Sequence, residues 1–80
     1  MTNKQLLKRI HYLQNKFIDI KGYSFHLNMN NKFEWQPSFD IFIHDSSCAI
    51  IFHTDLNIKN ENLNDKLKEL KDLVDELYYK

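Results

Sequence analysis

The chain has 80 residues, and 42% of them are hydrophobic, including six Phe, four Tyr and one Trp. A chain of this length has no room for a second domain, so we expect a single compact domain over residues 1–80, and because such a chain buries only about 60% of the surface its unfolded form exposes, its core must be efficient. Eleven basic residues balance eleven acidic ones, which argues against a dedicated nucleic-acid binder because such proteins carry a net positive charge. Cys48 is the one cysteine, so an internal disulfide is excluded, and no apolar segment fits a signal peptide or membrane span. We therefore expect a cytoplasmic protein.

The first predicted element is an amphipathic helix over residues 2–19. Its apolar stripe repeats at steps of four and three residues and consists of Leu6, Ile10, Leu13, Phe17 and Ile20, widened by Leu7 and Ile18. Thr2 and Gln5 have the spacing of a capping box, which predicts where the helix begins. Gly22, the only glycine, predicts where it ends.

Three segments with strand periodicity follow. Apolar and polar residues alternate from Tyr23 to Asn30, and a turn is expected at residues 30–32. Alternation resumes at Phe33 and Trp35 and continues to Ile43. Pro37 interrupts it, so either a bulge lies there or the second strand begins only at Ser38. The third predicted strand is residues 48–52.

The turns predict how the strands pair. A two-residue loop at Asp45 and Ser46 places the apolar residues of strands two and three opposite each other, in the pairs Ile43–Cys48, Ile41–Ile50 and Phe39–Phe52. A three-residue loop at 30–32 gives the pairs Met29–Phe33 and Leu27–Trp35. Both registers gather the apolar residues on one face of an antiparallel sheet.

A second amphipathic helix is predicted from about Asn60 to the end of the sequence. Its stripe is Leu63, Leu67, Leu70, Val74 and Leu77, and Asn60 or Asn62 is available as the N-cap. We expect the apolar stripes of both helices to be buried against the apolar face of the sheet. The predicted fold is therefore α+β, an αβββα two-layer sandwich with a three-stranded antiparallel sheet and both helices packed on one face.

The sequence offers little that could support catalysis. The predicted registers bring His26, His53, Asp40 and Asp55 toward one end of the open face of the sheet, where they suggest a divalent metal site or a Ser-His-Asp arrangement. Solvent-facing strand positions are also polar simply because they contact water, and the sequence has no ligand spacing of the kind that marks zinc sites. One glycine cannot form a phosphate-binding loop, and Cys48 is expected in the core. We therefore expect no enzyme, no cofactor and no metal.

The order helix, three strands, helix resembles that of the double-stranded-RNA-binding domain over the whole chain. That family has a lysine cluster at the start of its second helix and a His in the loop between its first two strands. Here the helix start reads Asn-Glu-Asn-Leu-Asn-Asp-Lys over residues 60–66, and the loop Asn-Asn-Lys over residues 30–32 has no His. The resemblance covers topology only, and it does not predict RNA binding.

Two helical surfaces are candidates for binding. The first helix carries a basic face formed by Lys8, Arg9, Tyr12 and Lys16, with Gln5 beside them, which could contact phosphates or an acidic protein. The second helix carries an acidic row at steps of four, four, three and four, formed by Glu61, Asp65, Glu69, Asp72 and Glu76. Like charges at this spacing repel. The row therefore predicts basic groups beside it, either on the first helix or on a partner.

The open face of the sheet is a third candidate. Phe42, Ala49 and Ile51 are expected there, and residues 48–52 form an uncharged edge strand. An uncovered edge of this kind promotes aggregation, so a homodimer or a partner is expected to cover it.

These features favour a small non-enzymatic protein-binding module that occupies a surface of a larger protein or protein–nucleic-acid complex. Size and the Lys- and Asn-rich composition resemble those of phage and mobile-element accessory proteins, including anti-CRISPR inhibitors. The alternatives are a nucleic-acid-binding module that uses the basic first helix and a self-assembling interaction domain. No membrane partner is expected.

Overall fold

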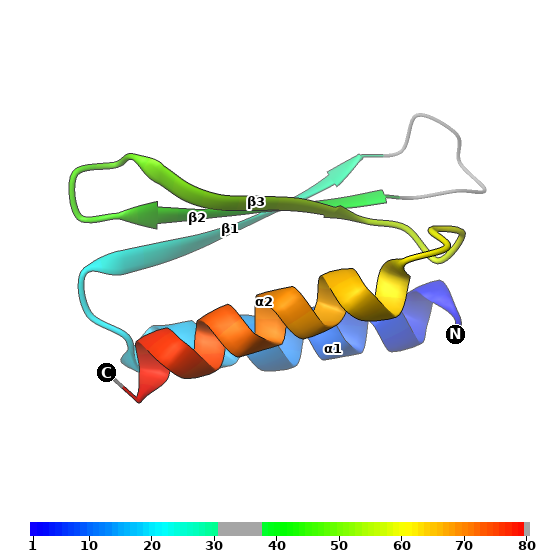
Figure 1. Ribbon diagram of the computed structural model, residues 1–80, viewed down its shortest axis with the longest axis horizontal. Coiled ribbons are helices and arrows are strands. Elements are labelled where there is room, and N and C mark those ends of the chain that lie inside the picture. The colour runs from blue at the N-terminus through cyan, green and yellow to red at the C-terminus, as the bar shows by residue number, and fades with distance from the viewer. Residues whose placement is uncertain (31–37, 80) are drawn as a thin grey trace.

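The structure is a computed structural model that describes residues 1–30 and 38–79. Its elements are α1 (Asn3–Lys16), the 3-10 helix η1 (Phe17–Asp19), β1 (Tyr23–Asn30), β2 (Ser38–Asp45), β3 (Ile50–Leu56) and α2 (Leu63–Tyr78). The strands form one antiparallel sheet in the order β1-β2-β3. Both helices lie on the same side of this sheet (Figure 1). The predicted αβββα two-layer sandwich is confirmed.

The capping box of α1 is confirmed. The Thr2 hydroxyl accepts a hydrogen bond from the backbone N–H of Gln5 at 3.1 Å, and the Gln5 side chain accepts one from the N–H of Thr2 at 2.9 Å. Gly22 follows the helical segment with a φ of 87°, a conformation that favours glycine. The expectation for Ile18 is wrong, because its side chain is 80% exposed. The tighter η1 turn brings Ile20, three residues after Phe17, back to the core instead.

The pairing of β1 with β2 differs from the prediction. Met29 lies opposite Phe39, and Leu27 lies opposite Ile41, so the predicted pairs with Phe33 and Trp35 are wrong. β2 begins at Ser38, which agrees with the second solution offered for Pro37. The predicted turn at 30–32 and the residues Phe33, Trp35 and Pro37 lie outside the described residues.

β3 is displaced along the chain by four residues from its predicted register. Ile43, Ile41 and Phe39 lie opposite Phe52, Thr54 and Leu56, respectively. The cause is a longer loop, in which the Asp45 carboxylate accepts the backbone N–H groups of Ser47 and Ala49 at 2.9 and 3.1 Å. A β-bulge follows between the pairs made by Ile43 and His44. From Phe52 onward, the four-residue shift keeps each side chain on its predicted face, because successive strand residues alternate between faces. Before the bulge the alternation changes: Ile50, predicted opposite Ile41 on the apolar face, lies opposite His44 and is 57% exposed, so its predicted placement is wrong.

This loop also overturns the placement of Cys48. The residue lies in the turn with a φ of 67°, and its side chain is exposed, so it is not part of the core. Its N–H donates to the Asp45 carbonyl at 3.0 Å. A turn closed in this way, followed by a left-handed residue, is a common three-residue hairpin loop.

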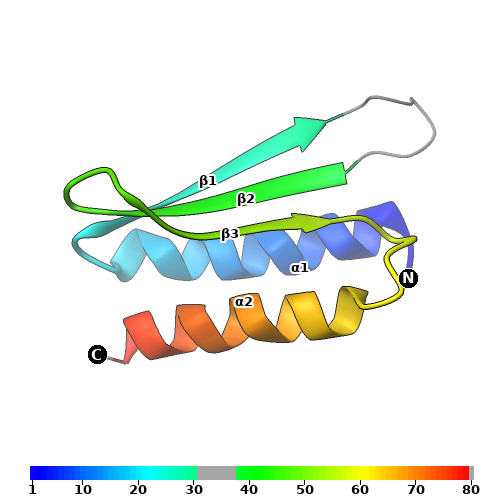
Figure 2. The same ribbon diagram turned by 45° about the horizontal axis from the view of Figure 1, so that its top comes forward.

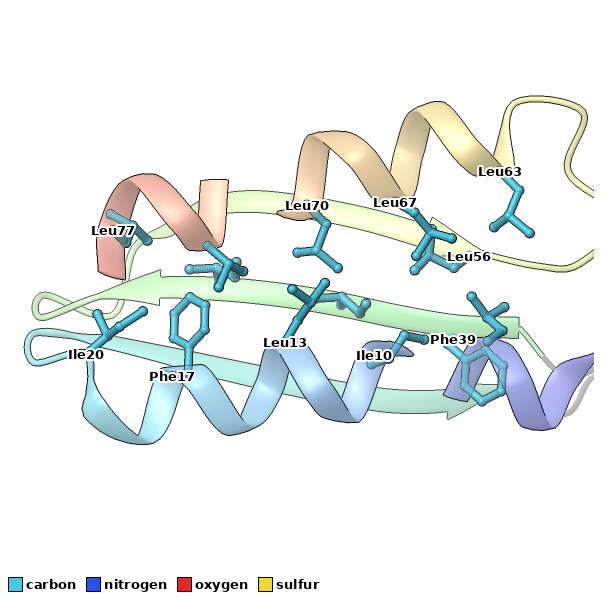
Figure 3. Packing of buried hydrophobic residues seen from close by; sticks show 14 residues of the cluster. Ile10, Leu13, Phe17, Ile20, Phe39, Leu56, Leu63, Leu67, Leu70 and Leu77 are labelled. Carbon is cyan, nitrogen blue, oxygen red and sulfur yellow. The ribbon is translucent and has the colours of Figure 1, made fainter. Parts of the chain in front are cut away.

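One core fills the space between the helices and the sheet (Figure 3). Its most completely buried side chains come from every layer: Leu6, Ile10, Ile41, Ile43, Leu56, Leu70 and Val74. Leu56 comes from the part of β3 that the sequence did not assign to a strand. Thr54, at 8% exposure, is the buried polar residue of the described chain.

α2 begins after Asn62, the second of the two predicted N-cap residues. Asn60 belongs to the preceding turn, where its side chain accepts the backbone N–H of Asn57 at 2.8 Å. Asn62 is the N-cap residue, but its side chain makes no capping hydrogen bond. Glu61 therefore precedes the helix rather than lying on it.

The two helices run side by side in the same direction (Figure 2). Their first turns lie at one end of the sandwich and their last turns at the other (Figure 1). Within the described residues, no helix combines the length and hydropathy needed to cross a membrane.

Candidate functional site

The acidic row lies on the outer side of α2. All five of its members are exposed. At about 100° per residue, the four members within the helix fall in an arc of about 60° opposite the buried positions. The sandwich thus presents a line of carboxylates to solvent along the whole length of α2.

The cations that form ion pairs in the described chain bind other acidic groups. Lys68, which forms none there, lies beside Asp65, Glu69 and Asp72, with which it lines a shallow hollow of the surface. Lys16 of α1 contacts Asp75 at 3.1 Å, and Lys71 contacts the same carboxylate at 3.4 Å. Lys66 donates to the backbone carbonyl of Asp55 at 3.0 Å and lies 4.0 Å from its carboxylate. Within residues 1–30 and 38–79, no ion pair involves Glu61, Asp65, Glu69, Asp72 or Glu76.

The Lys16–Asp75 pair is the electrostatic link between the helices. The hydrogen bond from Lys16 lowers the pKa of the Asp75 carboxyl and raises the pKa of the Lys16 amine. The amine also lies 5.3 and 5.7 Å from the ring centroids of Tyr12 and Tyr78. Among the cations of the basic face, Lys16 is thus the one with an ion pair in the described chain, and its partner is outside the acidic row.

The rest of the basic face borders a groove between the helices. We call it the interhelical groove; it has a volume of about 860 Å³, and its lining is Met1, Gln5, Lys8, Arg9, Tyr12 and Leu13 from the α1 side and Asn64, Leu67, Lys68 and Lys71 from α2. Most of its exposed lining is apolar. Four cations surround it, and none of these lining residues is acidic.

The groove was not predicted from the sequence, which indicated only the basic face on its α1 side. Lys68 and Lys71 flank the groove opposite Lys8 and Arg9, yet along the chain they are separated from them by the entire sheet. The signal was present, because Lys68 and Lys71 are one and four residues after the core residue Leu67 and lie on one side of its stripe. The spacing along α2 does not show that α1 lies on that side, because this follows only from the parallel packing of the two helices. Asp75, on the same side, was missed for the same reason.

The open face of the sheet has different rows from those predicted. His26, Phe42 and His53 form one row, and Asn28, Asp40 and Asp55 form the next. Of the four predicted ligands, Asp40 and Asp55 are therefore direct neighbours, while His26 and His53 lie in the adjacent row on either side of Phe42. Among the described residues, no group of three or more His, Cys, Asp or Glu side chains could hold a metal ion.

Aromatic contacts dominate this face instead. The ring of Phe42 is half-buried and stacks on His53 with centroids 4.4 Å apart, and His26 meets His44 edge-on at 4.7 Å. Ile51 is 44% exposed and is the extra residue at the β3 bulge. Phe42 thus has histidines as its cross-strand neighbours, while Ile51 lies next to the loop.

β3 is an edge strand, as predicted, but its composition differs from the uncharged one expected from the sequence. It spans Ile50–Leu56 and carries His53 and the charged Asp55 on the open face, so the edge is not uncharged. A charge on an edge strand disfavours pairing with another sheet. The argument for a partner covering this edge is weaker than the sequence suggested.

Comparison with known proteins adds no assignment. No protein-family model, no curated protein and no solved structure matches this chain.

Proposed function

We propose that this protein is a non-enzymatic protein-binding module, and that the acidic row on α2 binds a basic surface of a larger target. The single observation that carries the proposal is the lack of any ion pair between the row and the rest of the described chain. Repulsion within the row works against helix stability. An external basic surface would relieve it.

The distribution of partners within α2 supports this reading. Asp75 faces α1 and has two cations within 3.4 Å, so the helix uses one carboxylate for internal pairing. The acidic row lies on a different side of the same helix. Long-range attraction between such a row and a basic target speeds association and is weakened by salt.

The proposed mode of action is occupation of a surface on the target. A small accessory or inhibitor protein from a phage or mobile element acts in this way, and a basic nucleic-acid-binding channel of a larger enzyme or complex is the kind of surface that an acidic row fits. The alternative nucleic-acid-binding role would use Lys8, Arg9 and Tyr12, since Lys16 is already paired with Asp75.

The proposal is tested by affinity capture from an extract of the source organism. The bait is the tagged parent protein, the variant Glu69→Gln/Asp72→Asn/Glu76→Gln, or the control Asp19→Asn/Asp40→Asn, which removes acidic charge away from the row. We expect one protein, recovered in stoichiometric amount with the parent and the control, to fall at least about tenfold with the row variant.

Two results would contradict the proposal. Equal recovery by the row variant would show that the row does not bind the target. Nuclease-sensitive recovery of nucleic acid, lost on changing Lys8 and Arg9 to Glu, would favour the alternative role of the basic face.

A further inference from the structure

We infer that the interhelical groove is a second binding site, and that its ligand is an acidic amphipathic helix of a partner protein. This site adjoins the acidic row at Lys68, which lines the groove and also lies beside Asp65, Glu69 and Asp72. The row faces outward from α2, while the groove lies between α2 and α1. The inference rests on the shape, the lining and the charge of the groove.

The shape suits a short length of helix. Gln5 and Leu13 mark the groove along α1, which at 1.5 Å per residue gives a length of roughly 12 Å, or about two helical turns. Two parallel helices side by side leave a valley into which a third helix packs. Helix-in-groove recognition uses apolar anchors at positions i, i+3 or i+4, and i+7, which is a two-turn pattern.

The lining requires a ligand with an apolar side. Tyr12 is 62% exposed and Met1 is 47% exposed, and both line the groove together with the largely buried Leu13 and Leu67. A free phosphate or a nucleic-acid backbone would leave this apolar surface uncovered. An amphipathic helix would cover it with its own apolar face.

The charge requires that the rims of that helix be acidic. Lys8 and Arg9 lie on one side of the groove and Lys68 and Lys71 on the other. Of these four, Lys71 has an ion pair in the described chain, and it shares its partner Asp75 with Lys16. Cations on both sides match a helix whose apolar stripe is flanked by Asp or Glu.

The parallel packing of α1 and α2 predicts the direction in which the ligand helix binds. One end of the groove, at Gln5 and Asn64, lies at the first turns of both helices, where the positive ends of their dipoles lie together, and the other end reaches Leu13 of α1. A bound helix that runs the opposite way would place its negative C-terminal end there. We therefore expect the ligand helix to be antiparallel to α1 and α2.

The test uses three fluorescein-labelled peptides of about 18 residues with Leu, Phe or Met as anchors and Glu on both flanks. Fluorescence anisotropy at about 150 mM salt compares the parent with Lys8→Gln/Lys68→Gln and with the control Lys4→Gln/Lys21→Gln, which removes two exposed cations outside the groove. We expect the groove variant to bind about tenfold more weakly and the control to change binding less than about twofold. Glu69→Gln/Asp72→Asn/Glu76→Gln is expected to bind the peptides at least as well as the parent, so this site and the acidic row can fail separately.

Chemical-shift mapping of the peptide complex locates the site. We expect the largest shifts at Gln5, Tyr12, Asn64 and Lys71, with His53 on the open face unchanged. The inference is overturned if none of the three peptides binds at about 1 mM, or if a scrambled peptide of the same composition binds equally well. It is also overturned if a DNA duplex binds at the same residues more tightly than any of the peptides, because the groove would then be a general polyanion site.

Discussion

At the scale of single residues, carboxylates that form ion pairs within the fold and carboxylates that face solvent lie on different sides of α2. Asp75 and Asp72 are three residues apart on α2, yet the first holds two lysines while the second has no ion pair in the described chain. Within the described residues, a carboxylate of α2 therefore forms ion pairs only if it lies on the side that faces α1.

Asp75 gives a pH-dependent prediction. Its folded pKa is lowered from 3.8, chiefly by the hydrogen bond from Lys16. Below pH 3.8 the unfolded chain takes up a proton that the folded carboxylate resists, so this stabilisation is present above that pH and is lost as the pH falls through the folded pKa. Asp75→Asn should lower the melting temperature at pH 7 and bring it closer to that of the parent in acid. Thermal melts from pH 7 to pH 2 measure this, and an equal gap at every pH would contradict it.

Cys48 gives a prediction about backbone strain. Its φ of 67° is unfavourable for a side chain with a Cβ, and its thiol is exposed. Cys48→Gly should raise the free energy of unfolding by about 0.5–1 kcal/mol, because relief of the left-handed strain exceeds the entropic cost of glycine. Urea denaturation measures it. Ala49→Gly, at a position without positive φ, is the control and should be destabilising; a loss of stability in both would show that Cys48 is not strained.

At the scale of elements, the two helices begin in different ways. The capping box of α1 is complete, whereas the Asn62 side chain makes no capping bond at α2. Thr2→Ala should therefore lower the free energy of unfolding by about 1 kcal/mol. Asn62→Ala should change it by less than about 0.5 kcal/mol. Urea denaturation of the two variants distinguishes them, and equal losses would show that Asn62 does cap its helix in solution.

The elements also show what the sequence could predict. Helix periodicity and the Thr2–Gln5 spacing identified α1 and its start, because these signals are local. The face of most strand residues was correct, because alternation sets it, but Ile50 was placed on the wrong face because the β-bulge changes the alternation. The registers were not, because they depend on loop lengths. The Asp45 loop is stabilised by side chain-to-backbone hydrogen bonds that a count of turn residues does not reveal, and Leu56 was consequently left out of the core.

At the scale of the whole molecule, the sequence predicted the acidic row and the basic face of α1, but not the groove that this face borders. Helical spacing places residues on one face of their own helix, so the row and the basic face could be listed. It does not place one helix beside another. Lys68, Lys71 and Asp75 therefore acquired a role only when α2 was seen parallel to α1 (Figure 2).

The whole molecule presents two helical surfaces of opposite charge on one side of a sandwich whose net charge is zero. The acidic row lies outward on α2, and the cationic groove lies between the helices. Within the described residues, Lys71 is the member of these two surfaces that forms an ion pair, and it shares its partner Asp75 with Lys16. The helix layer, rather than the open face of the sheet, is thus the surface on which the proposed binding depends.

The central claim is that the acidic row does not stabilise the fold and faces a partner instead, and the free energy of unfolding of Glu69→Gln/Asp72→Asn/Glu76→Gln, measured by urea denaturation at pH 7, tests it most directly. Removing the repulsion along the row should leave this variant as stable as the parent or up to about 1 kcal/mol more stable. Asp75→Asn, measured alongside as the control for an internally paired carboxylate, should be less stable than the parent. A clear loss of stability in the row variant, as large as that of Asp75→Asn, would show that the row stabilises the fold and would contradict the claim.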